Sequence, residues 1–362
     1  MASEPIGVFQ MDVELNGHKN ELRHGTLALV LTCKSPRNRS VKVVKMNCDM
    51  AHRRCVGIGC RLKRNFSLDS KHLTPCSLLL SQRSHSNNNT TFATTAETKT
   101  MSLIASTFSM AGKSVLLSGA SSGLGAHFAR VLALSGCTKL VLSARRVQKL
   151  EALAATIRLE APGCIVCTVP IDISNVDSIS NGVHNAEEAV GAPMNVLINC
   201  AGVANPMLAT EMTESDWDQL MSVNLKGNFF MATEFAKRLI HAKEPGTIVN
   251  IASILSIRPG SRQSNYAASK AAMLMFNKVH AVEWSRYGIR TNCLCPGYFS
   301  TEMNDAFFLS TAGKQYLERI PPKRLGNLNE LNGPLLLLAS DASSFMTGTE
   351  IIVDLGHTNA AL

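Results

Sequence analysis

Residues 111–362 are predicted to form a single α/β domain, a three-layer sandwich built on a doubly wound parallel sheet. Short apolar runs alternate with amphipathic stretches along this whole segment. The runs lack the alternation of polar and apolar residues that a half-exposed sheet shows, so they indicate strands buried on both faces. The segment also contains neither an internal repeat nor a linker-like stretch, which favours one domain.

Each expected element follows from its own local pattern. The strands are continuous apolar runs of strand length, and they are expected at 115–117, 140–142, 164–169, 196–198, 247–251, 290–294 and 351–353. The helices carry apolar residues at helical spacing, as Leu150, Leu153 and Ile157 do. They are expected at 126–134, 146–159, 176–190, 216–241, 264–286 and 335–339.

The chain has a net charge of +9, and almost all of it lies in residues 1–110. Residues 111–362 are nearly balanced in charge, which gives no electrostatic reason to expect binding to nucleic acid or to a membrane surface. No apolar run reaches the length needed to cross a bilayer. A small-molecule partner is therefore expected for the domain.

Residues 1–100 have a different character from the rest, and we expect a basic, Ser- and Arg-rich extension that is disordered for much of its length. This composition is typical of an organellar transit peptide, although an acidic opening precedes it. Three interpretations stay open: a transit peptide with an unusual leader, one whose true start is Met46 or Met50, or a gene-model artefact with the start at Met101. The expected location is a mitochondrion or plastid in the first two cases and the cytoplasm in the third.

Eleven cysteines are spread without a disulfide framework, which favours a reducing compartment. Cys164 and Cys167 have the spacing of a metal or redox motif. They fall in an expected strand, where alternation places them on opposite faces, so no metal site is predicted.

Three glycines, Gly119, Gly123 and Gly125, lie between the first expected strand and its helix. A glycine-rich turn in this context is typical of a phosphate-binding loop at a helix N-terminus. Arg145 and Arg146 follow the second strand, where NAD-binding proteins often have an acidic residue for the ribose 2′-hydroxyl. Guanidinium groups suit a 2′-phosphate, so the sequence favours NADP over NAD.

Tyr266 and Lys270 are four residues apart in an expected helix and therefore lie on one face of it. A fixed cation beside a phenol favours the phenolate and brings proton transfer within reach. A serine from another element could hydrogen-bond the same reacting oxygen. Taken alone, the pair is more typical of an ordinary helix surface, because the spacing is common, and the other motifs favour the catalytic interpretation.

These motifs together resemble the short-chain dehydrogenase/reductase family, in its shorter branch with a single Rossmann-type catalytic domain. The resemblance covers roughly residues 110–356. It rests on the segments 118–125 and 199–202, on Asp172, Asn224, Ser253, Tyr266 and Lys270, and on the segment 296–301.

The resemblance implies a role for each matching residue. The cofactor would be NADP(H), held by Gly119, Ser121, Ser122, Gly123, Leu124, Gly125, Arg145, Arg146, Asp172, Ile173, Asn199, Ala201, Gly202, Tyr266, Lys270, Pro296, Gly297 and Thr301. Arg145 is expected to bind the 2′-phosphate with help from Arg146, and Asp172 and Ile173 to meet the adenine. Tyr266 would be the acid or base, with a pKa lowered by Lys270, while Ser253 positions the substrate oxygen and Asn224 supports a water-linked proton path.

The sequence departs from the family pattern at three positions. Ser118 replaces the usual threonine and keeps the hydroxyl. Cys200 replaces the second asparagine of its motif, and Leu355 stands where glycine is usual. We expect cofactor binding to persist, and we have no expectation for the effect of Leu355.

The expected activity is reduction of a ketone to a secondary alcohol, or the reverse, with NADP. The substrate segments after Gly202 and Thr301 are largely apolar, which suits a hydrophobic or thioester-linked ketone, although Phe307 and Phe308 could equally be core. A 3-oxoacyl-thioester reductase and a sugar-acid dehydrogenase remain alternatives within the family. A silent NADP-binding regulator and an epimerase or dehydratase are alternatives from other classes. The resemblance also implies a homotetramer built on the helices at 216–241 and 264–286.

Overall fold

The computed structural model describes residues 106–302 and 304–360, together with the backbone of four short strands nearer the N-terminus. The chain divides into two compact units, Met1–Thr95 and Ala96–Leu362. In the first unit β1 (Phe9–Gln10) pairs with β4 (Lys63–Arg64), and β2 (Ala28–Ser35) pairs with β3 (Asn38–Lys45), both antiparallel. Most of the extension predicted to be disordered lies outside the described residues, and its targeting role stays a prediction.

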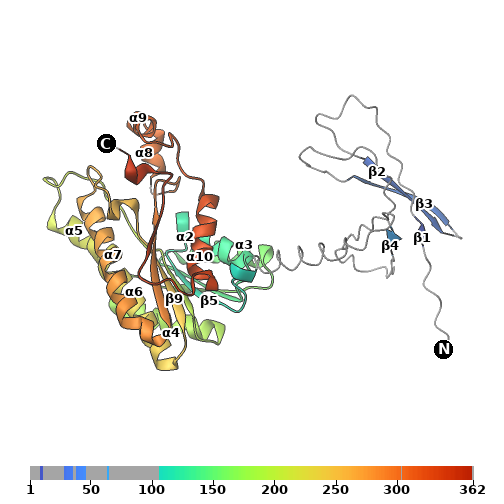
Figure 1. Cartoon of the computed structure of the whole chain (residues 1–362), viewed down its shortest axis with the longest axis horizontal. Helices are drawn as coiled ribbons and strands as arrows, with labels where there is room; N and C mark the ends of the chain where they lie inside the picture. Colours follow the sequence, from blue (N-terminus) through green and yellow to red (C-terminus); the bar gives the residue numbers. More distant parts are fainter. Residues whose placement is uncertain are drawn as a thin grey trace, which may run out of the picture. The chain divides into compact units, whose positions relative to one another are not determined.

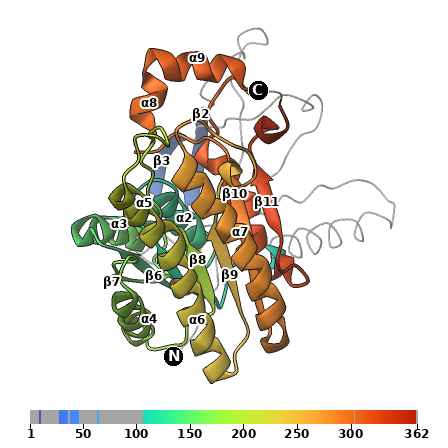
Figure 2. The ribbon, with the colours of Figure 1, turned by 90° about the vertical axis from the view of Figure 1, so that its left-hand side faces the viewer.

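The second unit is a seven-stranded parallel sheet covered by helices on both faces, as Figures 1 and 2 show. The strand order is β11-β10-β9-β8-β5-β6-β7. The strands are β5 (Ser114–Ser118), β6 (Lys139–Ala144), β7 (Ile165–Pro170), β8 (Val196–Asn199), β9 (Gly246–Ile251), β10 (Ile289–Pro296) and β11 (Glu350–Val353). This order reverses between β5 and β8, and open sheets bind ligands at such a point.

The two helical layers enclose separate halves of the core. One layer contains α2 (Gly123–Leu134), α3 (Val147–Glu160) and α10 (Asn332–Ala339). The other contains α4 (Val176–Val190), α6 (Asn228–Ala242) and α7 (Ser264–Trp284). Neighbouring residues of β5 face opposite layers: Leu117 packs with Phe128 of α2, whereas Leu116 packs with Phe235 of α6. Burial on both faces is what makes these strands continuously apolar.

The predicted fold is confirmed, and most expected strands and helices lie within one to three residues of the observed bounds. The expected helix at 216–241 is wrong in detail. It consists of α5 (Glu214–Met221), a π-helical segment (Ser222–Gly227) and α6. The Asn228 amide donates to the carbonyl oxygens of Val223 and Asn224, both at 3.0 Å, which stabilises the wider turn.

Two short helices were not predicted. These are α8 (Asp305–Leu309) and α9 (Thr311–Arg319), which together lie beyond one end of the sheet (Figure 2). Within the described residues, no helix is long and apolar enough to cross a membrane. The same part of the chain contains no group of His, Cys, Asp or Glu side chains placed to hold a metal ion.

Candidate active site

A cavity of about 1030 Å³ opens at the carboxyl ends of the central strands. The loops that follow β5, β6, β8, β9 and β10 all contribute to its lining. Parallel strands present these ends at one edge of the sheet, and this edge is where open α/β sheets bind ligands. The cavity therefore brings together segments that are almost two hundred residues apart in sequence.

The glycine turn between β5 and α2 fits the phosphates of a dinucleotide. Gly119 has φ +73°, and a Cβ atom there would lie 2.7 Å from the Cα of Ala201. A Cβ atom at Gly125 would lie 2.2 Å from the carbonyl oxygen of Gly119. Only glycine permits this close approach. The N-terminus of α2 therefore meets the cavity directly, and the N-cap residue Ser122 makes no side-chain cap. The first N–H groups of the helix are left for an anion.

Two arginines at the end of β6 have different surroundings. The Arg146 guanidinium donates to the hydroxyl of Ser121 at 3.0 Å and also to that of Ser122. It forms an exposed ion pair with Glu302 at 3.4 Å. Arg145 also lines the cavity, and its side chain has no hydrogen-bond or salt-bridge partner among the described residues, although its charge helps to lower the pKa of Asp172. Arg146 thus shapes the glycine turn, and Arg145 is free to bind a phosphate. These residues fit NADP better than NAD.

The loop after β8 is held by Ser118, the last residue of β5. Its hydroxyl accepts from the backbone N–H groups of Cys200 at 3.0 Å and Ala201 at 3.2 Å. Ser118 therefore fixes the start of the loop after β8. The Cys200 side chain lines the cavity, and burial raises the pKa of its thiol to about 12, so the thiol stays neutral.

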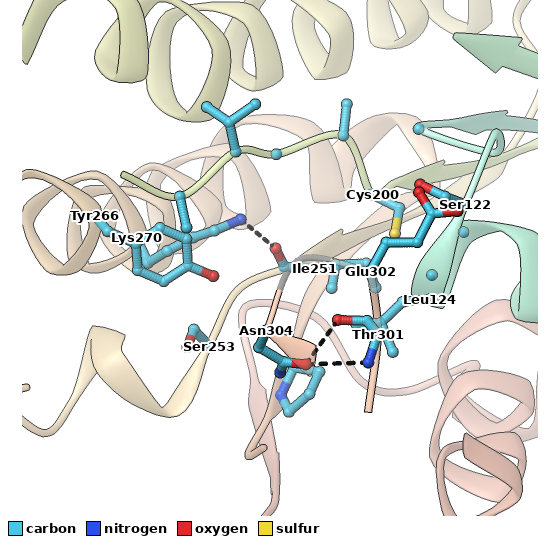
Figure 3. A pocket seen from close by; sticks show the side chains of 18 of the residues that line it. Ser122, Leu124, Cys200, Ile251, Ser253, Tyr266, Lys270, Thr301, Glu302 and Asn304 are labelled. Carbon is cyan, nitrogen blue, oxygen red and sulfur yellow. Dashed lines mark hydrogen bonds between the residues drawn. The ribbon is translucent and has the colours of Figure 1, made fainter. Parts of the chain in front are cut away.

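Ser253, Tyr266 and Lys270 lie together in the cavity wall, as Figure 3 shows. Ser253 follows β9, and its hydroxyl accepts from the N–H of Leu255 at 3.1 Å, which fixes its position at the start of a short 3₁₀ turn. Tyr266 and Lys270 belong to the first turns of α7. The Lys270 ammonium donates to the carbonyl oxygen of Ile251 at 2.7 Å and lies 5.9 Å from the centre of the Tyr266 ring.

The pKa of Tyr266 was expected to be lowered by Lys270, and the structure instead raises it. Burial raises the pKa of Tyr266, and the hydrogen bond with Ser253 only partly opposes this effect. Burial also lowers the pKa of Lys270 to about 8. Both shifts have the same cause, because a site with little water disfavours the charged form of each group. Tyr266 is therefore a neutral phenol that carries its proton at neutral pH.

Three of the expected site residues do not line the cavity. Asn224 lies in the π-helical segment. Its side-chain oxygen accepts from the N–H of Val203 and its side-chain nitrogen donates to the carbonyl oxygen of Val203, both at 2.8 Å. Asn199 is fully buried and donates to the carbonyl oxygen of Asn228 and to the side chain of Asn250. The Asp172 carboxylate accepts from the N–H and hydroxyl of Ser174. In this structure the side chains of these residues hold the loops that form the site.

The remaining expected residues do line the cavity, and they come from all parts of the domain. They are Gly119, Ser121, Ser122, Gly123, Leu124, Gly125, Arg145, Arg146, Ile173, Ala201, Gly202, Ser253, Tyr266, Lys270, Pro296, Gly297 and Thr301.

Sequence reasoning missed two aromatic residues of the cavity, Tyr298 and Tyr316, and left Phe308 open between a substrate contact and the core. Tyr298 lies directly after Gly297, Phe308 lies on α8 and Tyr316 on α9. Asn304 was also missed: its side-chain oxygen accepts from the N–H and hydroxyl of Thr301 and so fixes the loop before α8 (Figure 3). The position of all four residues soon after β10 was the available signal, because such residues lie at the binding edge of the sheet.

Comparison with known proteins agrees with this geometry. The model of the short chain dehydrogenase family matches residues 113–311. Gluconate 5-dehydrogenase of Gluconobacter oxydans is 37% identical over 254 residues, which are 69% of this chain and 96% of that protein. A crystal structure of a gluconate 5-dehydrogenase from Burkholderia cenocepacia, in complex with NADP and tartrate, is 34% identical with a TM-score of 0.67, and the match covers 71% of this chain and all of that one.

A further solved relative, levodione reductase, is 30% identical with a TM-score of 0.65, and the match covers 69% of this chain and 99% of that one. The matching family model, the overall identity and the shared fold lead to one conclusion: the chain belongs to the short-chain dehydrogenase/reductase family and is an oxidoreductase acting on CH–OH groups.

Proposed function

We propose that this oxidoreductase uses NADPH to reduce a ketone to a secondary alcohol, with Tyr266 as the proton donor. The observation that carries the proposal is the grouping of Ser253, Tyr266 and Lys270 in the same cavity as the glycine turn and Arg145. Bound NADPH would supply the hydride. The solved gluconate 5-dehydrogenase that resembles this chain contains NADP, which supports the choice of cofactor.

The protein's own residues would handle the substrate oxygen. The Ser253 hydroxyl accepts from the Leu255 N–H and hydrogen-bonds with Tyr266, and its proton can turn to the carbonyl oxygen of a bound ketone. Tyr266 would give its proton to the same oxygen as negative charge develops there. The Tyr266 phenol therefore carries its proton near neutral pH, as an ordinary phenol also does, and the proton is in place when a ketone binds. Lys270, fixed by Ile251, would stabilise the phenolate that remains.

A panel of ketones with NADPH tests this proposal. We expect loss of NADPH absorbance and one alcohol formed for each NADPH consumed. Product without net consumption of cofactor would instead indicate an epimerase. Tight NADPH binding with no conversion of any ketone in the panel would favour a silent regulator. Heat-inactivated protein is the control for spontaneous oxidation of the cofactor.

A sugar-acid dehydrogenase is the second candidate, because relatives over 30% identical carry names of that kind. The reaction and the use of Tyr266 would be the same, and only the substrate would differ. A 3-oxoacyl-thioester reductase stays a third possibility within the family and rests on the apolar segments of the sequence. Including 5-keto-D-gluconate and acetoacetyl-coenzyme A in the panel compares all three.

We also propose that the protein is a homotetramer. An exposed apolar stripe on α7 supports this: Met275, Val279 and Val282 are 63%, 47% and 80% exposed. Apolar faces of this kind favour association with a second copy. Light scattering after gel filtration should give the mass of four chains, and Val282→Glu should lower it; a monomeric parent protein would refute the proposal.

The targeting role of residues 1–100 is a separate proposal and rests on composition alone. N-terminal sequencing of the protein from its native cells tests it. A mature N-terminus well inside residues 1–100 would support a cleaved transit peptide, and an intact Met1 would refute both targeting interpretations.

A further inference from the structure

The end of the cavity beyond Tyr266 has a wall of aromatic rings. Tyr298, Phe307, Phe308 and Tyr316, here called the aromatic wall, all line it. They come from the loop after β10 and from α8 and α9, which lie together at one end of the sheet (Figures 1 and 2). Tyr298 meets Phe308 edge to face at 5.2 Å and Tyr316 edge to face at 5.6 Å. This geometry is the preferred one for aromatic rings, so the rings fix one another's positions.

The hydroxyl groups of the aromatic wall are already engaged. Burial raises the pKa of Tyr298, and the neighbouring Tyr316 hydroxyl adds to the effect. Tyr316 in turn contacts the Nε2 atom of His357 at 3.3 Å. Asn304, the nearby amide, uses its oxygen on Thr301 and its nitrogen on the carbonyl of Phe299. The wall therefore offers a substrate mainly the faces and edges of rings.

Other loops add apolar side chains to the same cavity. They are Val203, Ala204 and Pro206 from the loop after β8, together with Leu255. Among the described lining residues at this end, Arg262 is the one cation apart from Lys270, and it lies at the rim, 4.0 Å from Glu211 and 53% exposed. Ser261 and Gln263, on either side of Arg262, also line the cavity but belong to a largely exposed segment. A polyhydroxy acid packed against the rings would lose water from hydroxyl groups that the ring faces do not bond, and such desolvation opposes binding.

We propose that the substrate is a ketone attached to or contained in an apolar ring, an aryl or cyclic ketone, and that the aromatic wall selects it. This inference rests on the proposed function for the position of the carbonyl, which lies between Ser253 and Tyr266. The ring of the substrate then packs against Tyr298, Phe308 and Tyr316. The same wall disfavours sugar acids, despite the names of the relatives.

Turnover with matched ketones tests the inference. With NADPH in excess, we compare cyclohexanone and acetophenone with 5-keto-D-gluconate and acetoacetyl-coenzyme A. The expected kcat/KM of the better ring ketone is at least about tenfold above that of either polar substrate, as differences in apolar contact produce in other sites. A higher kcat/KM for 5-keto-D-gluconate or for the thioester overturns the inference and leaves the proposed function standing.

Binding separates the two proposals. The Tyr266→Phe protein with NADPH bound is titrated with the same ring ketones by calorimetry, so that no turnover is needed. Binding of the ring ketone without turnover by the parent protein would support the inference and refute the proposed reduction. Failure of the ring ketones to bind at concentrations where 5-keto-D-gluconate binds would overturn the inference.

Substitutions in the wall test the rings themselves. Tyr316→Ala should raise KM for the ring ketone about tenfold or more, and Tyr316→Phe should recover most of this loss because the ring returns. The Kd for NADPH should be unchanged in both variants, whereas misfolding would raise it. Leu309→Ala is the control, since Leu309 lies on α8, is 74% exposed and does not line the cavity. Loss of ring-ketone binding in Tyr316→Phe as large as in Tyr316→Ala would overturn the role of the ring.

Discussion

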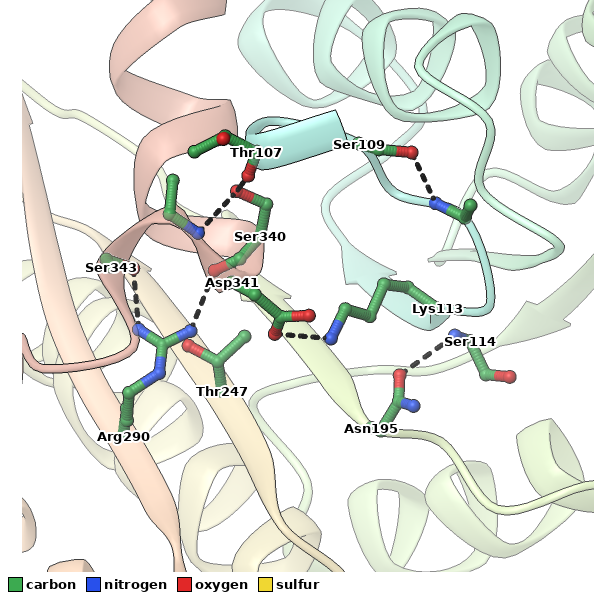
Figure 4. A network of polar contacts seen from close by, with 12 residues as sticks. Thr107, Ser109, Lys113, Ser114, Asn195, Thr247, Arg290, Ser340, Asp341 and Ser343 are labelled. Atoms are coloured by element: carbon green, nitrogen blue, oxygen red, sulfur yellow. Dashed lines mark hydrogen bonds and ion pairs between the residues drawn. The ribbon is translucent and has the colours of Figure 1, made fainter. Parts of the chain in front are cut away.

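Polar side chains gather at both edges of the parallel sheet, but they are used differently at each. At the amino edge Lys113 forms an ion pair with Asp341 at 2.6 Å, and Arg290 donates to Ser343 and to the carbonyl of Ser340 (Figure 4). Asn195 accepts from the N–H of Ser114 in the same network. At the carboxyl edge the Arg145 side chain has no hydrogen bond or salt bridge among the described residues, and the Ser253 hydroxyl lines the cavity beside Tyr266.

The contrast separates stability from function. Groups that bond one another contribute to the free energy of folding, most of all where breaking the bond leaves a buried partner unsatisfied, as at the part-buried Arg290. Groups left without partners give the fold little and are available to a ligand. Substitutions at the amino edge should therefore change stability, and those at the carboxyl edge should change catalysis.

The largest effect is expected for Tyr266→Phe. Loss of a positioned proton donor should lower kcat by about 10²–10⁴-fold, while the Kd for NADPH and the melting temperature stay near the parent values. Steady-state kinetics, fluorescence titration and thermal melting measure the three quantities. A variant with the kcat of the parent protein would remove Tyr266 from the chemistry.

Arg145→Ala should have the next largest effect, this time on the choice of cofactor. Loss of charge-assisted bonds to the 2′-phosphate should reduce kcat/KM for NADPH about ten- to a hundredfold and leave NADH almost unaffected. Lys139→Ala is the matched control, because Lys139 is a cation at the opposite end of the same strand. Equal losses with NADPH and NADH would argue against phosphate binding by Arg145.

Arg290→Ala, at the amino edge, should lower stability and leave catalysis unchanged. It leaves the Ser340 carbonyl and the Ser343 hydroxyl without their donor, which should cost about 1–3 kcal/mol of unfolding free energy. The kcat/KM of the folded variant should not change. Urea unfolding measures the loss, and Lys237→Ala, in an exposed ion pair on α6, is the control. A stable Arg290→Ala protein with poor kinetics would contradict the division between the edges.

The smallest effect is expected at Leu355, close to the end of β11. Leu355 has φ +51° and is 65% exposed, so its side chain adds little packing to offset the left-handed backbone. Leu355→Gly should raise the unfolding free energy by about 1 kcal/mol. Leu355→Ala keeps the strained backbone and should show no such gain. Equal stability of the two variants would mean that the backbone carries no strain there.

Local patterns were sufficient to predict most of this fold. The strands are apolar throughout, and α4 follows from the spacing of Ile179, Val183 and Ala186 with the correct bounds. The glycine turn could also be predicted from the sequence, because the close approach of Gly119 to Ala201 requires glycine at that position. In each case the pattern and its cause lie within one segment of the chain.

Other features depend on contacts that a linear pattern does not contain. The sequence predicts Asn199 as a site residue. Its amide instead donates to the carbonyl oxygen of Asn228 and the side-chain oxygen of Asn250, which come from two other elements. The raised pKa of Tyr266 could not be anticipated either, because it follows from burial by distant segments. The helix at 216–241 looked regular, since nothing local marks Asn228 as a donor to Val223 and Asn224.

The π-helical segment at Ser222–Gly227 has a consequence for how this protein can change. An α-helix turns by about 100° for each residue, so one residue absorbed in a wide turn resets the angle between α5 and α6. Deleting a single residue here would restore a regular helix and rotate Asn224 away from Val203. A change in the length of this helix by one residue should therefore disturb the loop that Asn224 holds through Val203.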